Sequence, residues 1–169
     1  MQALHNDMTT HGTIIGWKES VALPDWGIEG LRAKADTGAR RSAIDVKHLR
    51  ELPDGRIEFD IVLDRRRPDE TRRIVSEVSH VTHVRSSNGQ QHERYFVTTR
   101  LRLGGREKLI ELSLVNRREM VCRMLLGRKA LEGDYLVDSS RTYVLGPRKR
   151  AKATVDRTSS KPKTRKRLP

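Results

Sequence analysis

Apolar residues along this chain fall into short stretches, and glycine, proline, asparagine and aspartate separate one stretch from the next. Within 57–63 apolar and polar side chains alternate, which is typical of a strand with one buried face. Residues typical of turns lie before this stretch, at Pro53-Asp54-Gly55, and further along the chain at Gly104-Gly105. A single helical turn is expected at 128–132, where Gly133 ends it. The pattern predicts strands at 13–17, 20–23, 30–35, 42–46, 57–63, 73–78, 95–103, 108–115, 120–126, 135–137 and 142–145.

This succession of short strands predicts one mainly β domain, barrel-like or sandwich-like, over residues 13–146. Residues 1–12 lack periodicity, and we expect a flexible N-terminus. Residues 147–169 hold ten Lys or Arg and one acid, so the tail carries +9 of the net charge of +13. With almost no apolar side chains, it is expected to be disordered. It either contacts RNA, the ribosome or another polyanion, or only keeps the chain soluble.

The cysteine content and the lack of long apolar runs indicate in which part of the cell the protein occurs. The single cysteine, Cys122, lies in the apolar stretch 120–126 and forms neither an internal disulfide nor a cysteine cluster for zinc. We therefore expect a buried, inert thiol in a reducing environment. No apolar run approaches the roughly 20 residues of a membrane helix, and the first ten residues are polar. These features predict a soluble, cytoplasmic protein without membrane contact.

The candidate chemistry begins at Asp36-Thr37-Gly38, where the predicted strand 30–35 ends. An acid, a hydroxyl and a glycine at a strand end suit a carboxylate that works with a second one to activate water. The same three residues also form ordinary strand-to-turn corners. The motif alone leaves both interpretations open.

A second stretch, Leu125-Leu126-Gly127-Arg128, changes that balance. An apolar strand followed by glycine and arginine, about ninety residues after Asp36, together with Asp-Thr-Gly-Ala resembles the retropepsin half-barrel of retroviral aspartic proteases. The resemblance implies a closed, mainly β half-barrel with one short C-terminal helix. It also implies that Asp36, Thr37 and Gly38 form the catalytic loop, which Leu125, Leu126, Gly127 and Arg128 support from below.

Further motifs narrow the resemblance. The chain is similar to the bacterial and archaeal ATP-dependent zinc protease family, which is regarded as retropepsin-like; the similarity covers roughly Thr13 to Gly146. The motifs that carry it are Ile15-Gly16-Trp17, Leu23-Pro24, Lys34-Ala35-Asp36-Thr37-Gly38-Ala39-Arg40, Ser86-Ser87-Asn88-Gly89, Leu103-Gly104-Gly105, Asn116-Arg117 and Arg123-Met124-Leu125-Leu126-Gly127-Arg128.

The family label names zinc and ATP, but the residues favour neither, and we expect no metal and no cofactor. No His-Glu-x-x-His is present. His80, His83 and His92 together could bind zinc, but His80 and His83 would lie on opposite faces of a strand. No Gly-x4-Gly-Lys-Ser/Thr element occurs either.

An aspartic protease needs two carboxylates that share one proton, and this chain contains one Asp-Thr-Gly. Activity would therefore require a homodimer with an Asp36 from each subunit at the two-fold axis. By similarity, Thr37 would join the two loops across the axis, and Gly38 would admit the substrate backbone.

Substrate contacts are expected from Ala39, Arg40, Arg41, Asn88 and Gly89. The hairpin turn at 86–89 is either the flap that closes over substrate or an ordinary surface hairpin. In retroviral enzymes an acid after Asp-Thr-Gly-Ala pairs with the arginine of the Gly-Arg segment. Here Arg40 takes that position and Arg41 follows, so Arg128 needs another partner. The two arginines either favour acidic substrates or are solvated surface residues.

Two functions follow as expectations. One is a homodimeric aspartic peptidase that acts on a protein or peptide, with acidic, glutamate-tailed or ribosomal substrates suggested by the resemblance and by the arginines. The other is a catalytically silent retropepsin-like module that binds ribosome or RNA through its basic tail.

Overall fold

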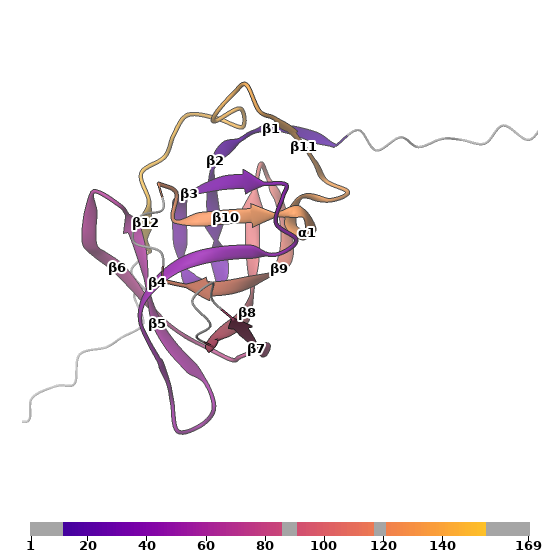
Figure 1. The fold of residues 1–169 in the computed structure, drawn as a ribbon. Coiled ribbons are helices and arrows are strands. Elements are labelled where there is room, and N and C mark those ends of the chain that lie inside the picture. Colours follow the sequence, from indigo (N-terminus) through magenta and orange to yellow (C-terminus); the bar gives the residue numbers. More distant parts are fainter. Residues whose placement is uncertain (1–11, 86–90, 117–120, 155–169) are drawn as a thin grey trace, which may run out of the picture.

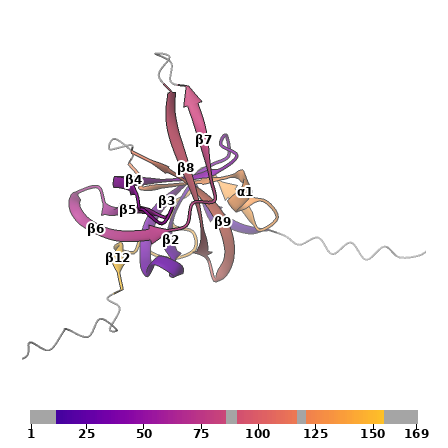
Figure 2. The same cartoon turned by 90° about the horizontal axis from the view of Figure 1, so that it is seen from below.

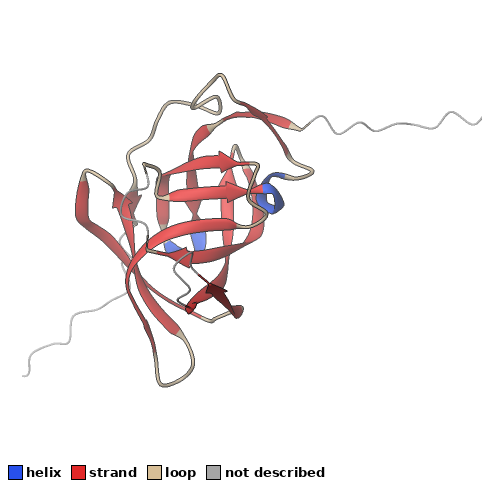
Figure 3. Ribbon diagram, viewed as in Figure 1, coloured by secondary structure: helices blue, strands red, loops and turns tan. Residues whose placement is uncertain are grey.

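The computed structural model describes residues 12–85, 91–116 and 121–154. Their elements are β1 (Thr13–Gly16), β2 (Lys18–Leu23), η1 (Pro24–Trp26), β3 (Ile28–Asp36), β4 (Ser42–Glu51), β5 (Ile57–Asp64), β6 (Arg67–Ser76), β7 (His80–Arg85), β8 (Gln91–Leu103), β9 (Arg106–Val115), β10 (Met124–Gly127), α1 (Arg128–Leu131), β11 (Tyr135–Asp138) and β12 (Lys152–Ala153). Strands dominate, and the helical pieces are short (Figure 3). The prediction of a mainly β, retropepsin-like fold with one short α-helix is confirmed.

Six strands form a closed barrel in the order β10-β3-β2-β8-β9-β4. The strand β10 closes it, because it pairs in parallel with β3 and antiparallel with β4 (Figure 1). Its first residue, Met124, lies opposite both Ala33 and Ile44 and is fully buried. Three of the four β10 residues are buried, which is consistent with the apolar run that the sequence supplies there.

Two hairpins extend the barrel. The β5–β6 hairpin continues the sheet beyond β4, and its Phe59 packs edge-on against Trp26 with ring centroids 5.7 Å apart. The other hairpin joins β7 to the first part of β8, with His80 opposite Phe96, and projects from the barrel (Figure 2). The turn at 86–89, expected to be either a flap or an ordinary surface hairpin, lies outside the described residues. We did not predict β7, because its polar residues hide any alternation.

The structure also differs from the predicted strand pattern elsewhere: β4 extends to Glu51, and β6 covers Arg67–Ser76 rather than the predicted 73–78. The strand expected at 120–126 begins only at Met124, while Cys122 is buried as expected. The segment 142–145 is not a strand, since Tyr143 has a left-handed backbone (φ 55°) that breaks an extended run.

The C-terminal segment continues past the expected end of the domain at Gly146. Residues Lys152 and Ala153 form β12 and pair with β3, and the neighbouring Ala151 is buried. Residues 147–154 of the predicted tail therefore pack on the barrel. Among the described residues, no helix is long and apolar enough to cross a membrane.

Candidate active site

The Asp36 loop begins where β3 ends, and the loop itself holds the carboxylate. Oδ1 of Asp36 accepts hydrogen bonds from the backbone N–H groups of Gly38 and Ala39, each at 3.2 Å. Among the residues that the structure describes, no donor contacts Oδ2. The Asp36 side chain is half-buried, whereas Thr37 and Gly38 are exposed. One carboxylate oxygen is thus fixed by the chain and the other remains available to a ligand or to a second molecule.

The strand β10 lies directly beside the Asp36 loop. Gly127 is in register with Asp36, and its backbone N–H donates to Oγ of the buried Ser42 at 3.1 Å. A Cβ on Gly127 would come within 2.4 Å of the carbonyl carbon and oxygen of Arg41. The glycine is therefore required by the close approach of two backbones, since its own φ of −75° suits any residue. Leu126 is buried beneath the loop, and Leu125 is half-buried.

Arg128 finds its partners in the loop backbone. Nη1 of Arg128 donates to the carbonyl oxygens of Thr37 at 2.9 Å and Gly38 at 3.0 Å. The backbone N–H of Arg128 also donates to the carbonyl of Ala39 at 2.8 Å. A guanidinium suits this task because several N–H donors project in one plane. Arg128 therefore binds loop carbonyls in place of the acid that retroviral enzymes supply.

A charged cluster joins the segment after the loop to the β7–β8 hairpin. Nε of Arg41 contacts Oε2 of Glu111 at 2.6 Å, and Nδ1 of His80 contacts Oε1 of the same carboxylate at 3.1 Å. The Arg41 guanidinium lies 5.0 Å from the Phe96 ring centroid, and His80 stacks on that ring at 4.3 Å. Sequence reasoning missed Glu111 and His80 here, because the partners come from four separate segments.

The two arginines after the loop have different environments. Arg41 forms one wall of a cavity of about 330 Å³ that Glu111 and Lys129 also line. Arg40 is exposed, and its side chain has no ion pair among the described residues. Of the remaining candidate substrate contacts, Ala39 lies in the loop, while Asn88 and Gly89 fall outside the described residues.

The histidines do not fit a zinc site. Nδ1 of His80 is engaged by Glu111, and the exposed His83 lies three residues further along β7, on its other face. No group of three or more His, Cys, Asp or Glu side chains suited to a metal occurs in 12–85, 91–116 and 121–154. No chemical step is therefore assigned to a metal.

Comparisons with known proteins agree with this geometry. Residues 14–148 match the family model RimB-like, described as retropepsin-like aspartic endopeptidase RimB. A Shewanella pealeana protein named "Probable alpha-L-glutamate ligase" is 34% identical over 142 residues, which cover 82% of this chain and 31% of that protein. A Desulfotalea psychrophila protein of the same name is 31% identical over 165 residues, which cover 90% and 33%. The chain thus spans about a third of the length of these curated relatives.

A solved structure shares the fold. A Legionella pneumophila protein of unknown function aligns with a TM-score of 0.64 and 23% identity, covering 79% of this chain and 98% of that one.

Proposed function

Since this chain belongs to the RimB-like family of retropepsin-like aspartic endopeptidases, we propose that it is a homodimeric aspartic peptidase whose two Asp36 carboxylates activate water. The observation that carries the proposal is the state of Asp36. Two loop amides hold Oδ1, while Oδ2 has no donor among the described residues. The loop that presents this carboxylate is fastened by Arg128 and by the close contact with Gly127.

In the proposed reaction the two Asp36 side chains share one proton. The ionised carboxylate removes a proton from a water molecule, and the protonated one donates its hydrogen bond to the carbonyl oxygen of the scissile amide. Attack of the water gives a tetrahedral intermediate. Transfer of a proton to the nitrogen then releases an amine and a carboxylic acid. Thr37 would tie the two loops together across the dimer axis, and Gly38 would leave room for the substrate backbone.

The dimer is required because the chain supplies one Asp-Thr-Gly. Like charges at close range keep one carboxylate protonated, and a second copy of the chain would bring the second Asp36 that this requires. An isologous two-fold contact would bring the same loop from each subunit to one place.

For the substrate we propose an acidic protein or peptide. Arg40 is exposed beside the Asp36 loop, and a guanidinium binds carboxylates through charge-assisted hydrogen bonds. The curated relatives are named as glutamate ligases, so a chain that carries ligated glutamates, for example on a ribosomal protein, is the substrate class that unites these observations.

The first experiment compares Asp36→Asn with Asp54→Asn, which changes an exposed turn carboxylate remote from the loop. Hydrolysis of glutamate-rich and neutral peptides is followed by mass spectrometry, and circular dichroism checks the fold. We expect Asp36→Asn to abolish hydrolysis and Asp54→Asn to leave it unchanged. Undiminished hydrolysis by a folded Asp36→Asn protein would refute the proposal.

A second experiment tests whether the site is shared between subunits. Wild-type and Asp36→Asn chains are mixed under conditions in which subunits exchange, and the activity is measured against the wild-type fraction. If one dimer needs both carboxylates, an equal mixture retains about a quarter of the wild-type activity, because only homodimers of wild-type chains are active. Retention of half would show that each chain acts alone.

The second candidate function is a silent module that binds ribosome or RNA. It is favoured by the packed segment 147–154, where Arg148, Lys149 and Arg150 are exposed and, with Arg32 and Arg67, line a cavity of about 360 Å³. Replacement of Arg148, Lys149 and Arg150 by methionine tests it: we then expect RNA binding to weaken, while neither the wild type nor the variant hydrolyses peptides. An RNA affinity that the replacements leave unchanged would count against this function.

A further inference from the structure

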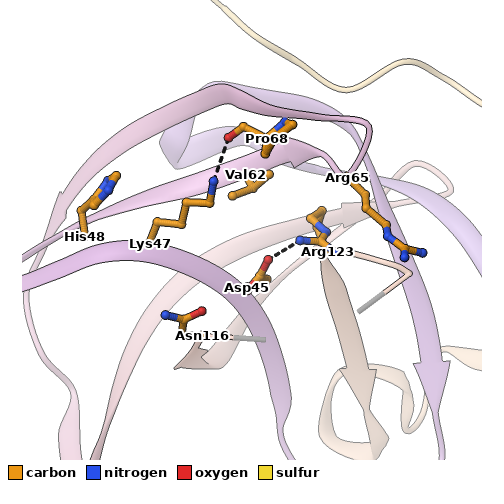
Figure 4. A pocket seen from close by; sticks show the side chains of 8 residues that line it. All are labelled: Asp45, Lys47, His48, Val62, Arg65, Pro68, Asn116 and Arg123. Atoms are coloured by element: carbon orange, nitrogen blue, oxygen red, sulfur yellow. Dashed lines mark hydrogen bonds and ion pairs between the residues drawn. The ribbon is translucent and has the colours of Figure 1, made fainter. Parts of the chain in front are cut away.

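Another cavity, of about 390 Å³, lies away from the Asp36 loop, at the opposite end of β10. Arg123 lines it just before β10 begins at Met124, whereas Gly127 at the far end of the strand lies beside Asp36. Residues of β4, β5 and β6, the turn between β5 and β6, and Asn116 just after β9 form its other walls (Figure 4). Its volume is in the range of small-molecule sites.

The floor of this cavity is a buried ion pair between Asp45 and Arg123. Both side chains are almost inaccessible, at 2% and 4% exposure, and the backbone N–H of Asp45 also donates to the carbonyl of Arg123 at 2.8 Å. Because Arg123 compensates the charge of Asp45, this carboxylate does not repel an anion above it. The pair therefore forms a rigid base with no net charge, and the net charge of the cavity depends on the cations in its walls.

Two cations of the walls have no carboxylate partner in the described parts of the chain. Nζ of Lys47 donates to the neutral carbonyl of Pro68 at 3.1 Å, which leaves its charge and its other N–H groups available. Arg65, exposed in the turn between β5 and β6, takes part in no ion pair there. Together they place two positive charges on the walls of a cavity of small-molecule size.

One residue that lines the cavity, His48, has an unusual backbone conformation. His48 has a left-handed backbone, φ 50°, and lies in an irregularity of the β4–β5 pairing between Lys47 and Arg50. Such conformations are costly for residues other than glycine and gather at functional sites. Its Nδ1 contacts Oδ2 of Asp60 at 2.9 Å, so the ring is held in place at the rim.

From these features we infer that the cavity binds a small molecule through a phosphate group. A phosphate carries close to two negative charges at neutral pH and presents several acceptor oxygens, which matches the two cations of the walls. Lys47 and Arg65 contribute the charge, His48 forms part of the rim, and the Asp45–Arg123 pair keeps the floor rigid. A single carboxylate would match only one of the two cations. This inference does not depend on the proposed peptidase activity.

The test is a titration of the full-length, ¹⁵N-labelled protein with inorganic pyrophosphate, followed by NMR and calorimetry at physiological salt. We expect saturable one-to-one binding, with shift changes at Asp45, Lys47, His48 and Arg123. Lys47→Met and Arg65→Met should each weaken the affinity by about tenfold, because each removes a charged contact.

The matched control is Arg66→Met, which removes an exposed arginine next to Arg65 that does not line the cavity. We expect the affinity of this variant to equal that of the wild type. Equal weakening by Arg66→Met would overturn the inference, because it would show attraction to general surface charge. Succinate that binds as tightly as pyrophosphate would overturn the choice of phosphate. Asp36→Asn should bind pyrophosphate normally, which separates this result from any failure of the peptidase proposal.

Discussion

Gly127→Ala is the most direct test of how β10 supports the Asp36 loop. The backbone of Gly127, with φ −75° and ψ 169°, is one that alanine adopts freely, so the substitution carries no conformational penalty. It places a methyl group 2.4 Å from the Arg41 carbonyl carbon and oxygen and 2.9 Å from the Arg41 nitrogen. All three are backbone atoms, which cannot rotate away as a side chain would.

The magnitude follows from this contact. Ordinary van der Waals contact begins near 3.4 Å, so Arg41 or Gly127 must move by about 1 Å. Overpacking of this kind costs roughly 1–3 kcal/mol. Loss of the Gly127 N–H to Ser42 Oγ hydrogen bond adds about 1 kcal/mol. We therefore expect a loss of about 2–4 kcal/mol in the free energy of unfolding, which lowers Tm by roughly 6–12 °C for a domain of this size.

Urea and thermal unfolding, followed by circular dichroism, measure the change, and backbone amide shifts of residues 36–41 report movement of the loop. Gly133→Ala is the matched control, since that glycine has φ +81° but open space around its Cβ position. It should cost only about 1 kcal/mol, from the left-handed backbone. If Gly127→Ala were no more destabilising than Gly133→Ala, the close contact with Arg41 would not support the loop.

Arg128→Met should loosen the Asp36 loop, because the carbonyls of Thr37 and Gly38 lose the guanidinium donor. We expect faster amide hydrogen exchange at Ala39 in this variant and unchanged exchange in the control Lys129→Met. Glu111→Gln should release Arg41 and the base of the β7–β8 hairpin, and exchange along β7 should then rise several-fold by NMR. For Asp60, bonds from the Arg73 guanidinium hold the pKa of the carboxyl below its usual range, so its stabilisation is present above about pH 4 and is lost as pH falls through the lowered value. Asp60→Asn should accordingly destabilise by about 1–2 kcal/mol at pH 6, a difference that shrinks toward pH 2.5 in urea unfolding.

Each of these expectations has a result that would contradict it. Equal exchange in the Arg128 and Lys129 variants would mean that the carbonyl contacts do not hold the loop. Unchanged exchange along β7 in Glu111→Gln would mean that the aromatic stack with Phe96 suffices to hold the hairpin. A destabilisation by Asp60→Asn that is the same at pH 6 and pH 2.5 would show that the carboxylate charge contributes nothing.

The sequence by itself determined the elements whose signals are local. Alternation marked β5, and the glycine pair 104–105 marked the turn from β8 to β9, because each depends on neighbours within a few residues. The order of Asp-Thr-Gly and Leu-Leu-Gly-Arg along the chain also indicated the retropepsin-like fold. Local signals failed where a segment is stabilised from outside, as with the polar β7, the turn at Tyr143 and the packed segment that ends in β12.

Only the tertiary structure decided what the candidate site residues contact. The sequence could not identify the partner of Arg128, because its acceptors are the backbone carbonyls of Thr37 and Gly38. Every residue has a backbone carbonyl, so the residue types at these positions give no signal. In the sequence Glu111 is one of the polar residues of an alternating strand, yet the pairing of β9 with β4 and β8 brings it between Arg41 and His80. The pairing of β4 with β5 and with β10 likewise brings Lys47, Arg65 and Arg123 to one cavity. The physical reason is that such contacts depend on the register of strands far apart in the chain, which a local pattern does not encode.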